Sequence, residues 1–266
     1  MAGKAHLVPR VLTGLLLTLL LAVSAACGGQ AGKNLAGDPA GAGTTGKPLE
    51  FEVVDNVAEL PTPIQEWLDL FRVIGGLDTL TVDGYTYLLV ALGERPTGGY
   101  AVEIERVAEP YPGGCRVWYR TRSPKPGEFV TQAFTYPYAL VRVAARTDDC
   151  RFLHSRHEGG PAPVRTGSLR IEPELAARLQ AHVDAGHSTW LTDPLEAAQR
   201  LGIAVGFSPD AEFQLLAPAD KGAAAAGRAE VRVTQDGASY IVELIQPNGP
   251  DPHGIWLLSG VGRGSK

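Results

Sequence analysis

The stretch Leu92-Gly93-Glu94-Arg95-Pro96-Thr97-Gly98-Gly99-Tyr100 decides how the first half of this 266-residue chain folds, because it joins two strand-like segments. The segment before it, residues 85–92, is rich in aromatic and branched residues, and the segment after it, residues 100–105, alternates apolar with polar residues. Pro96 fixes its own φ, and the Gly98-Gly99 pair can adopt φ values that side chains forbid. We therefore expect a turn of defined shape that carries no catalytic group and suits contact with another molecule.

This stretch also carries a family resemblance. Residues 87–100 resemble the signature of the PrcB C-terminal domain, and a weaker similarity continues through Pro124-Lys125-Pro126-Gly127 and Thr135-Tyr136-Pro137 to about Phe152. The resemblance implies a bacterial lipoprotein that accompanies a secreted protease complex. We expect the partner to be an exported protease or another envelope protein. The residues expected to contact it are Arg95, Pro96, Thr97, Gly98, Gly99, Tyr100, Tyr136 and Pro137.

Two other functions remain open. The run from Pro96 to Tyr100 is similar to the Asn-Pro-Thr-Thr-Gly-Tyr loop of chagasin-type cysteine-protease inhibitors, although Arg95 stands where that family has Asn. That similarity implies a protease inhibitor that inserts the Arg95–Tyr100 loop into an active-site cleft. The other alternative is a cell-envelope or sporulation-related binding protein whose second domain does the work.

The turn also has a purely structural interpretation, in which the glycines only close a tight hairpin and Tyr100 belongs to the core. The contact hypothesis instead places Arg95 and Thr97 on the surface. Replacing either by Ala should then shift stability by less than ~0.5 kcal/mol.

Residues 1–26 have the pattern of a secretory signal peptide. Lys4 and Arg10 precede the apolar run Val11 to Val23, which is shorter than the ~20 residues that a membrane-spanning helix needs. Small residues and then Cys27 follow, as in bacterial lipoproteins, although Ser24 stands where Leu is commonest. We expect Cys27 to be the lipid-modified first residue of the mature chain. The alternative is ordinary cleavage that happens to precede a Cys.

Residues 27–47 are dominated by Gly, Ala and Thr and are predicted to form a flexible tether. Anchor and tether together predict a lipoprotein at the extracytoplasmic face of a membrane. Residues 1–26 contain two of the 24 basic residues and none of the 29 acidic ones, which leaves 22 against 29 and a net charge of −7. This acidic balance gives no support to nucleic-acid binding.

The remaining sequence predicts an α+β fold with two domains. Residues 48–158 are expected to form a β-rich antiparallel sandwich or barrel-like domain with one short helix. Thr62 and Gln65 suggest a capping box for that helix, and Asp83-Gly84 suggests a hairpin turn. The strands expected in this domain cover residues 49–54, 80–82, 85–92, 100–105, 115–121, 129–135, 138–145 and 150–154.

Residues 164–262 are expected to form a small α+β domain after the linker 159–163. Pro173 opens one predicted helix. Asp193 and Pro194 supply the N-cap and first residue of a second helix, which Gly202 closes. The strands expected here cover residues 213–216, 229–234, 239–245 and 254–258, and residues 222–227 are expected to be a loop.

Cys115 and Cys150 remain as a pair once Cys27 is assigned to the lipid, and we expect them to form a disulfide in an exported domain. Closing a loop of about 35 residues would contribute on the order of 3–4 kcal/mol. The alternative is two free, buried thiols.

The sequence contains no Walker loop, no Gly-x-Ser-x-Gly elbow and no His-Glu-x-x-His motif. Its six histidines are scattered, and the pairs His154/His157 and His182/His187 have no obvious third ligand. We therefore expect a binding protein that is not an enzyme, with no metal and no cofactor.

Overall fold

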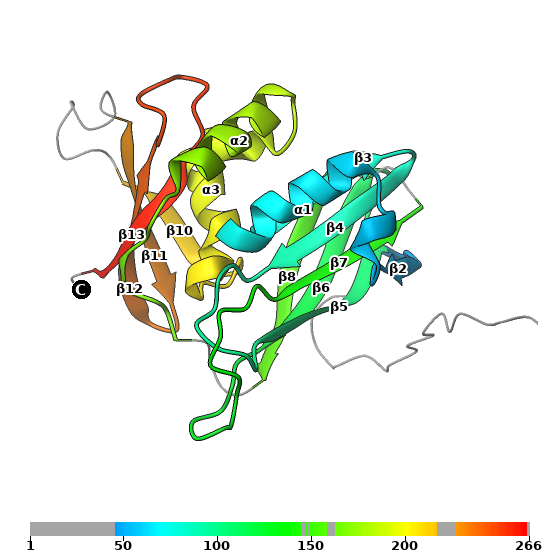
Figure 1. Cartoon of the computed structure of the whole chain (residues 1–266), viewed down its shortest axis with the longest axis horizontal. Coiled ribbons are helices and arrows are strands. Elements are labelled where there is room, and N and C mark those ends of the chain that lie inside the picture. Colours follow the sequence, from blue (N-terminus) through cyan, green and yellow to red (C-terminus); the bar gives the residue numbers. More distant parts are fainter. Residues whose placement is uncertain (1–45, 145–146, 148, 159–162, 217–226, 265–266) are drawn as a thin grey trace, which may run out of the picture. The chain divides into compact units, whose positions relative to one another are not determined.

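The computed structural model describes residues 46–144, 147, 149–158, 163–216 and 227–264 (Figure 1). The predicted signal peptide, Cys27 and nearly all of the tether lie outside the described residues. Most of the predicted loop 222–227 lies outside them too. No helix within the described ranges is long and apolar enough to cross a membrane.

Two four-stranded sheets form a sandwich from the first half of the chain. The first sheet has the order β1-β5-β6-β8 and the second has the order β2-β7-β4-β3. The strands are β1 (Lys47–Pro48), β2 (Phe51–Val53), β3 (Gly76–Val82), β4 (Tyr85–Ala91), β5 (Ala101–Glu109), β6 (Gly114–Arg122), β7 (Tyr138–Val143) and β8 (Asp149–Glu158). The predicted α+β class is confirmed, and neither sheet closes into a barrel.

The hairpin predicted at Asp83-Gly84 is confirmed, with φ of 52° and 81° at its two residues and β3 antiparallel to β4. These paired positive φ values match the twist of the flanking strands. One pair departs from the expected antiparallel pattern, because β6 and β8 run parallel. A parallel pair needs a crossover, and β7 in the opposite sheet provides it.

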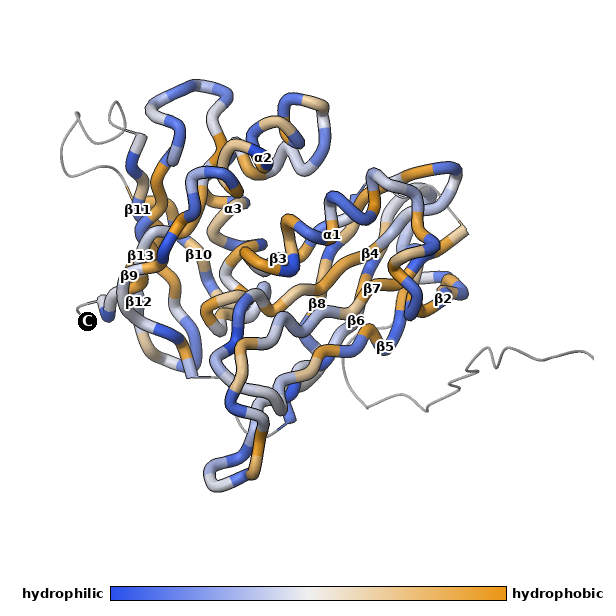
Figure 2. The backbone as a smooth tube through the Cα atoms, viewed as in Figure 1, coloured by the Kyte–Doolittle hydropathy of each residue, from blue (hydrophilic) through white to orange (hydrophobic). Residues whose placement is uncertain are grey.

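The second sheet is buried on both faces, and β4 shows this most clearly. Leu88 and Val90 face the first sheet in one core cluster, whereas Tyr87, Leu89 and Ala91 belong to a second cluster on the helical side. A strand covered on both faces has no solvent side. For this reason the sequence of β4 is almost continuously apolar. Figure 2 shows this apolar character along the strand.

Helices lie between the second sheet and a third sheet (Figure 1). The helices are η1 (Val57–Glu59), α1 (Thr62–Ile74), α2 (Pro173–Asp184), η2 (Thr189–Thr192), α3 (Pro194–Leu201) and η3 (Gly202–Val205). The third sheet has the order β10-β11-β12-β13-β9, from β9 (Gly167–Ser168), β10 (Glu212–Leu215), β11 (Arg228–Gln235), β12 (Ala238–Ile245) and β13 (Leu257–Arg263).

The two predicted domains correspond to separate sheets but share one hydrophobic cluster. That cluster joins α1 and β4 to α2, α3 and the third sheet. All the residues that the structure describes accordingly belong to one compact unit. The boundary proposed at 159–163 stays a prediction.

Two local predictions are wrong. Thr62 does not cap α1, because Pro61 is the N-cap and the Gln65 side chain donates to the Leu60 carbonyl instead, at 2.7 Å. Residues 129–135 form no strand, and only Thr135 pairs, in an isolated bridge with Arg95. The predicted cap at Asp193 is confirmed, since its carboxylate accepts from the backbone N–H groups of Leu195 and Glu196.

A buried carboxylate joins the sandwich to the C-terminal half. Asp78 on β3 is 2% exposed, and its two oxygens accept hydrogen bonds from the indole N–H of Trp67 and of Trp190, each at 2.8 Å. The Ser188 hydroxyl also donates to it. Because these three donors come from α1, η2 and the residue before η2, one side chain fixes α1 and the η2 segment to the sheet.

Replacing Asp78 by Asn should lower the free energy of unfolding by about 2–4 kcal/mol, because an amide nitrogen would then face a buried indole N–H. Urea denaturation measures the change. Asp69→Asn on the exposed face of α1 is the matched control and should stay within ~0.5 kcal/mol of the parent. Equal midpoints for the two variants would contradict this role of Asp78.

Candidate protein-binding site

Arg95, expected at the surface, is buried. Its side chain is 7% exposed, and its guanidinium donates to the carbonyl oxygens of Ala204 at 2.7 Å and Ile203 at 3.3 Å. Burial, followed by the positive charge of Arg165, lowers the pKa of Arg95 to about 10. The expectation of a surface residue is therefore wrong, and Arg95 connects the turn to η3.

The other turn residues differ in exposure. Pro96 is exposed, whereas Thr97, Gly98, Gly99 and Tyr100 are half-buried. Gly99 has φ of 85°, and a Cβ there would meet Val130 at 2.7 Å, so this glycine is required by both backbone and space. Gly98 has no positive φ and only ordinary contact distances around a built Cβ. The sequence predicted that both positions need glycine for their φ angles, but only Gly99 does.

Residues 123–137, which we call the docking loop, extend away from the sheets between β6 and β7 (Figure 1). Its first turn places Pro126 and Gly127 at the two central positions, and Glu128 N donates to Lys125 O at 3.0 Å. Gly127 has φ of 81°, as the third residue of a type II turn requires. Arg122 fixes the same turn through an ion pair with Glu128.

Hydrogen bonds tie the docking loop to the turn along its length. Gly98 N donates to Thr131 O at 2.8 Å, and Arg95 and Thr135 exchange both backbone hydrogen bonds. The Tyr136 hydroxyl donates to the Glu94 carboxylate at 3.0 Å, and Leu92 N donates to Pro137 O at 2.9 Å. The predicted contact residues Tyr136 and Pro137 therefore lie beside the turn, and the loop and the turn form one hydrogen-bonded unit.

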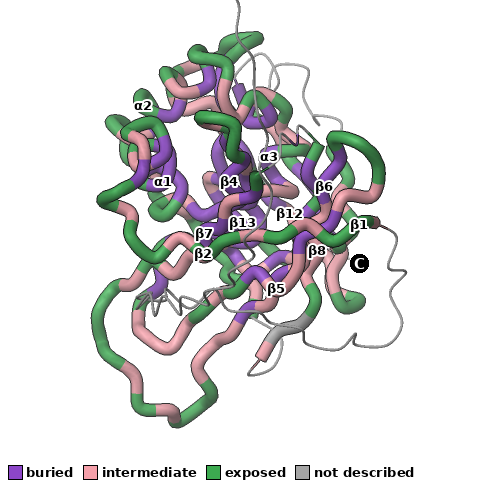
Figure 3. Tube along the Cα trace, turned by 90° about the vertical axis from the view of Figure 1, so that its right-hand side faces the viewer, coloured by how far each residue is buried: buried purple, intermediate pink, exposed green. Residues whose placement is uncertain are grey.

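This unit presents apolar side chains to solvent. Phe129 is 103% exposed, Phe134 68% and Tyr136 38%. Every residue of the docking loop is exposed or half-buried, as Figure 3 shows at its lower end. Sequence reasoning missed Phe129 and Phe134 because it assigned them to a strand. The signal that could have found them is the pair of aromatic residues in a segment without period-two alternation, next to a Pro-Lys-Pro-Gly turn.

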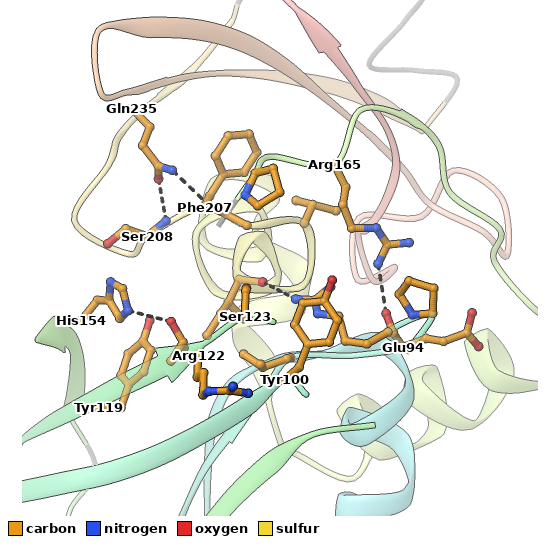
Figure 4. A pocket seen from close by; sticks show the side chains of 18 of the residues that line it. Glu94, Tyr100, Tyr119, Arg122, Ser123, His154, Arg165, Phe207, Ser208 and Gln235 are labelled. Atoms are coloured by element: carbon orange, nitrogen blue, oxygen red, sulfur yellow. Dashed lines mark hydrogen bonds between the residues drawn. The ribbon is translucent and has the colours of Figure 1, made fainter. Parts of the chain in front are cut away.

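A cavity of about 620 Å³ lies where the turn and the ends of β6 and β8 meet the C-terminal half (Figure 4). Tyr100 and Phe134 line it from the first half, and Phe207 and Arg165 line it from the second. Tyr119 and His154 lie together at one end of the view, and Arg165 and Glu94 lie at the other. Sequence reasoning missed this site, because its walls come from segments separated by more than a hundred residues.

Cys115 and Cys150 are direct partners in the β6–β8 ladder, and both are buried. No disulfide joins them in this structure, and the Thr147 hydroxyl lies 3.2 Å from the Cys150 sulfur. The hydrogen bond between the two thiols, followed by burial, raises the pKa of Cys115. The disulfide stays a prediction, which the intact mass of the alkylated exported protein with and without reductant decides.

One polar cluster superficially resembles a catalytic arrangement. His182 Nε2 lies 3.1 Å from Ser188 Oγ, but the single proton of this hydroxyl is donated to Asp78. His182 must therefore donate to Ser188 and cannot act as its base. Burial lowers the pKa of His182, which keeps the ring neutral. The described residues also include no group of three potential metal ligands.

One segment in the first half of the chain matches the model of a known protein family. Residues 86–144, which run from β4 to the end of β7, match the model described as PrcB C-terminal. This segment is therefore similar to the PrcB C-terminal family. It contains the whole turn and the whole docking loop, so the resemblance inferred from the turn is confirmed. No curated protein and no solved structure gives a significant match to this chain.

Replacing Arg95 by Ala should lower the free energy of unfolding by about 1.5–3 kcal/mol, because two charge-assisted hydrogen bonds to η3 are lost. Thr97→Ala, which removes only a weak contact to the next carbonyl, should change it by less than ~0.5 kcal/mol. Chemical denaturation of both variants measures the difference. If Arg95→Ala unfolds like the parent, the bond to η3 does not connect the two halves.

Proposed function

We propose that this chain is a lipid-anchored extracytoplasmic accessory or assembly subunit of an exported protease complex. The PrcB C-terminal match supports association with such a complex. The proposed anchor is Cys27, and residues 27–47 are the proposed tether. The proposed contact surface is the docking loop with the turn beneath it.

One observation carries this proposal: the docking loop exposes Phe129 and Phe134 while hydrogen bonds hold it to the turn. Exposed large apolar side chains gathered on one protruding segment mark protein contact surfaces. Because the loop is fixed by the turn and by the Arg122–Glu128 ion pair, little conformational entropy is lost when it binds. Aromatic residues with few rotatable bonds are also favoured anchors of such interfaces.

The proposed role is non-enzymatic. The side chains that the docking loop presents most openly are phenyl rings, which supply contact area and no nucleophile or general base. The turn beneath is half-buried by the loop, so any insertion into a protease cleft would be led by the docking loop. Both the accessory-subunit proposal and the chagasin-like inhibitor hypothesis therefore use the docking loop. Measuring protease activity in the captured complex distinguishes one from the other.

Replacing Phe129 and Phe134 together by Ser should reduce capture of an exported protease from detergent-solubilised native membranes by at least about tenfold, as loss of an interface anchor does. The melting temperature should not change, because neither ring is buried. Leu215→Ser, at 45% exposed on β10, is the matched control and should retain capture. Undiminished capture by the double variant would contradict the docking loop as the contact surface. A captured protease that is inactive would support the inhibitor function instead.

Replacing Cys27 by Ser should move the full-length protein from the membrane fraction to the soluble fraction, because no acyl chain can then be attached. Stable anchoring needs more than one acyl chain or a second membrane signal. The control variant Ser24→Leu brings the cleavage region closer to the usual lipoprotein pattern and should stay in the membrane. Detergent-free fractionation measures both, and retention of Cys27→Ser in the membrane would refute lipid anchoring at this residue.

A further inference from the structure

The cavity described above has a cationic end. Arg165 is exposed, and one of its guanidinium nitrogens donates to Glu94 O at 3.0 Å. Arg95 is bonded to backbone carbonyls. Among the residues that the structure describes, neither guanidinium forms an ion pair. Their mutual repulsion contributes to the lowered pKa of Arg95, so an anion beside them would be stabilised.

The lining contains three arginines and two carboxylates, those of Glu94 and Asp236. Arg122 is already paired with Glu128, and the Glu94 carboxylate accepts from Tyr136. Asp236 lies exposed in the turn between β11 and β12. Figure 4 shows the Glu94 carboxylate directed away from Arg165, so an incoming anion meets the guanidinium first.

The opposite end of the cavity offers a buried donor. Tyr119 is 1% exposed and is one of the residues that line the cavity. Burial and then the charge of Asp210 raise the pKa of Tyr119, so the phenol stays neutral and can donate. An acceptor on a ligand would receive this hydrogen bond.

Aromatic side chains line the cavity between these two ends. Tyr100, Phe134 and Phe207 supply apolar surface, and the volume of about 620 Å³ lies within the range of small-ligand sites. A ligand that matches has an anion at one end, an apolar side chain in the middle and a carbonyl acceptor further along. The carboxyl-terminal end of a peptide has this order of groups.

We infer that this cavity binds the free carboxyl terminus of an extended peptide. The carboxylate lies at Arg165 and Arg95, the last side chain packs on Tyr100 and Phe207, and a preceding carbonyl accepts from Tyr119. Phe129 does not line the cavity, so a Phe129→Ser variant should bind such a peptide normally.

Fluorescence anisotropy with the peptide Ala-Ala-Leu-Phe, labelled at its amino end, tests the inference on the full chain. The peptide with a free carboxylate should bind about tenfold or more tightly than its carboxyl-terminal amide, the difference expected for a charge-assisted contact. Arg165→Gln should reduce the affinity for the acid to that for the amide. Tyr119→Phe should weaken both peptides severalfold without lowering the melting temperature.

The matched control is Arg170→Gln, five residues further along, because Arg170 is 87% exposed, pairs with Glu172 and does not line the cavity. This variant should bind like the parent. Equal binding of acid and amide, or undiminished binding by Arg165→Gln, would overturn the inference. An amide-capped peptide ending in Asp that binds as tightly as the acid would show recognition of a side-chain carboxylate and would also overturn it.

Discussion

The arrangement of the two halves depends on the hydrogen bonds that the buried carboxylate of Asp78 accepts. Asp78 lies on β3 and accepts from Trp67 on α1 and Trp190 on η2. A buried charge and two buried indole N–H groups each carry a desolvation cost that only their mutual hydrogen bonds remove. The connection then continues to the third sheet, because Trp256 N donates to Leu191 O at 2.7 Å. The second sheet and the C-terminal half are thus joined by satisfied polar groups within an apolar cluster.

The burial of β4 also supports the docking loop. Because β4 is covered on both faces, the chain leaving it at Leu92 starts from a fixed position. Gly93, with φ of 72°, turns the chain where a Cβ would meet Ile74 at 3.3 Å. The Arg95 guanidinium then bonds to η3. A loop mounted on such a turn loses little further freedom when a partner binds, so its exposed aromatic rings are presented at low entropic cost.

The turn separates two surfaces of different chemistry. The docking loop offers phenyl rings to solvent, which suits a contact based on apolar area. The cavity beyond Arg95 has the guanidinium groups of Arg95 and Arg165 at one end and the phenol of Tyr119 at the other, which suits recognition of a carboxylate. Phe134 contributes to both, since it is exposed on the loop and lines the cavity. In the proposed function the docking loop contacts the protease, and in the further inference the cavity binds the carboxyl terminus of a peptide.

The sequence by itself determined the features that depend on neighbouring residues. Asp83-Gly84 specifies its hairpin through positive φ, Asp193-Pro194 specifies a helix start, and the run from Tyr87 to Tyr100 identifies the PrcB C-terminal match. Tertiary structure alone decided the burial of Arg95, because its acceptors at Ile203 and Ala204 lie more than a hundred residues away. It also decided that Phe129 and Phe134 stay in solvent, since apolar composition predicts burial only where another element covers the side chain. The cavity could not be predicted for the same reason, because its walls meet only after the turn, β6 and β8 have packed against the C-terminal half.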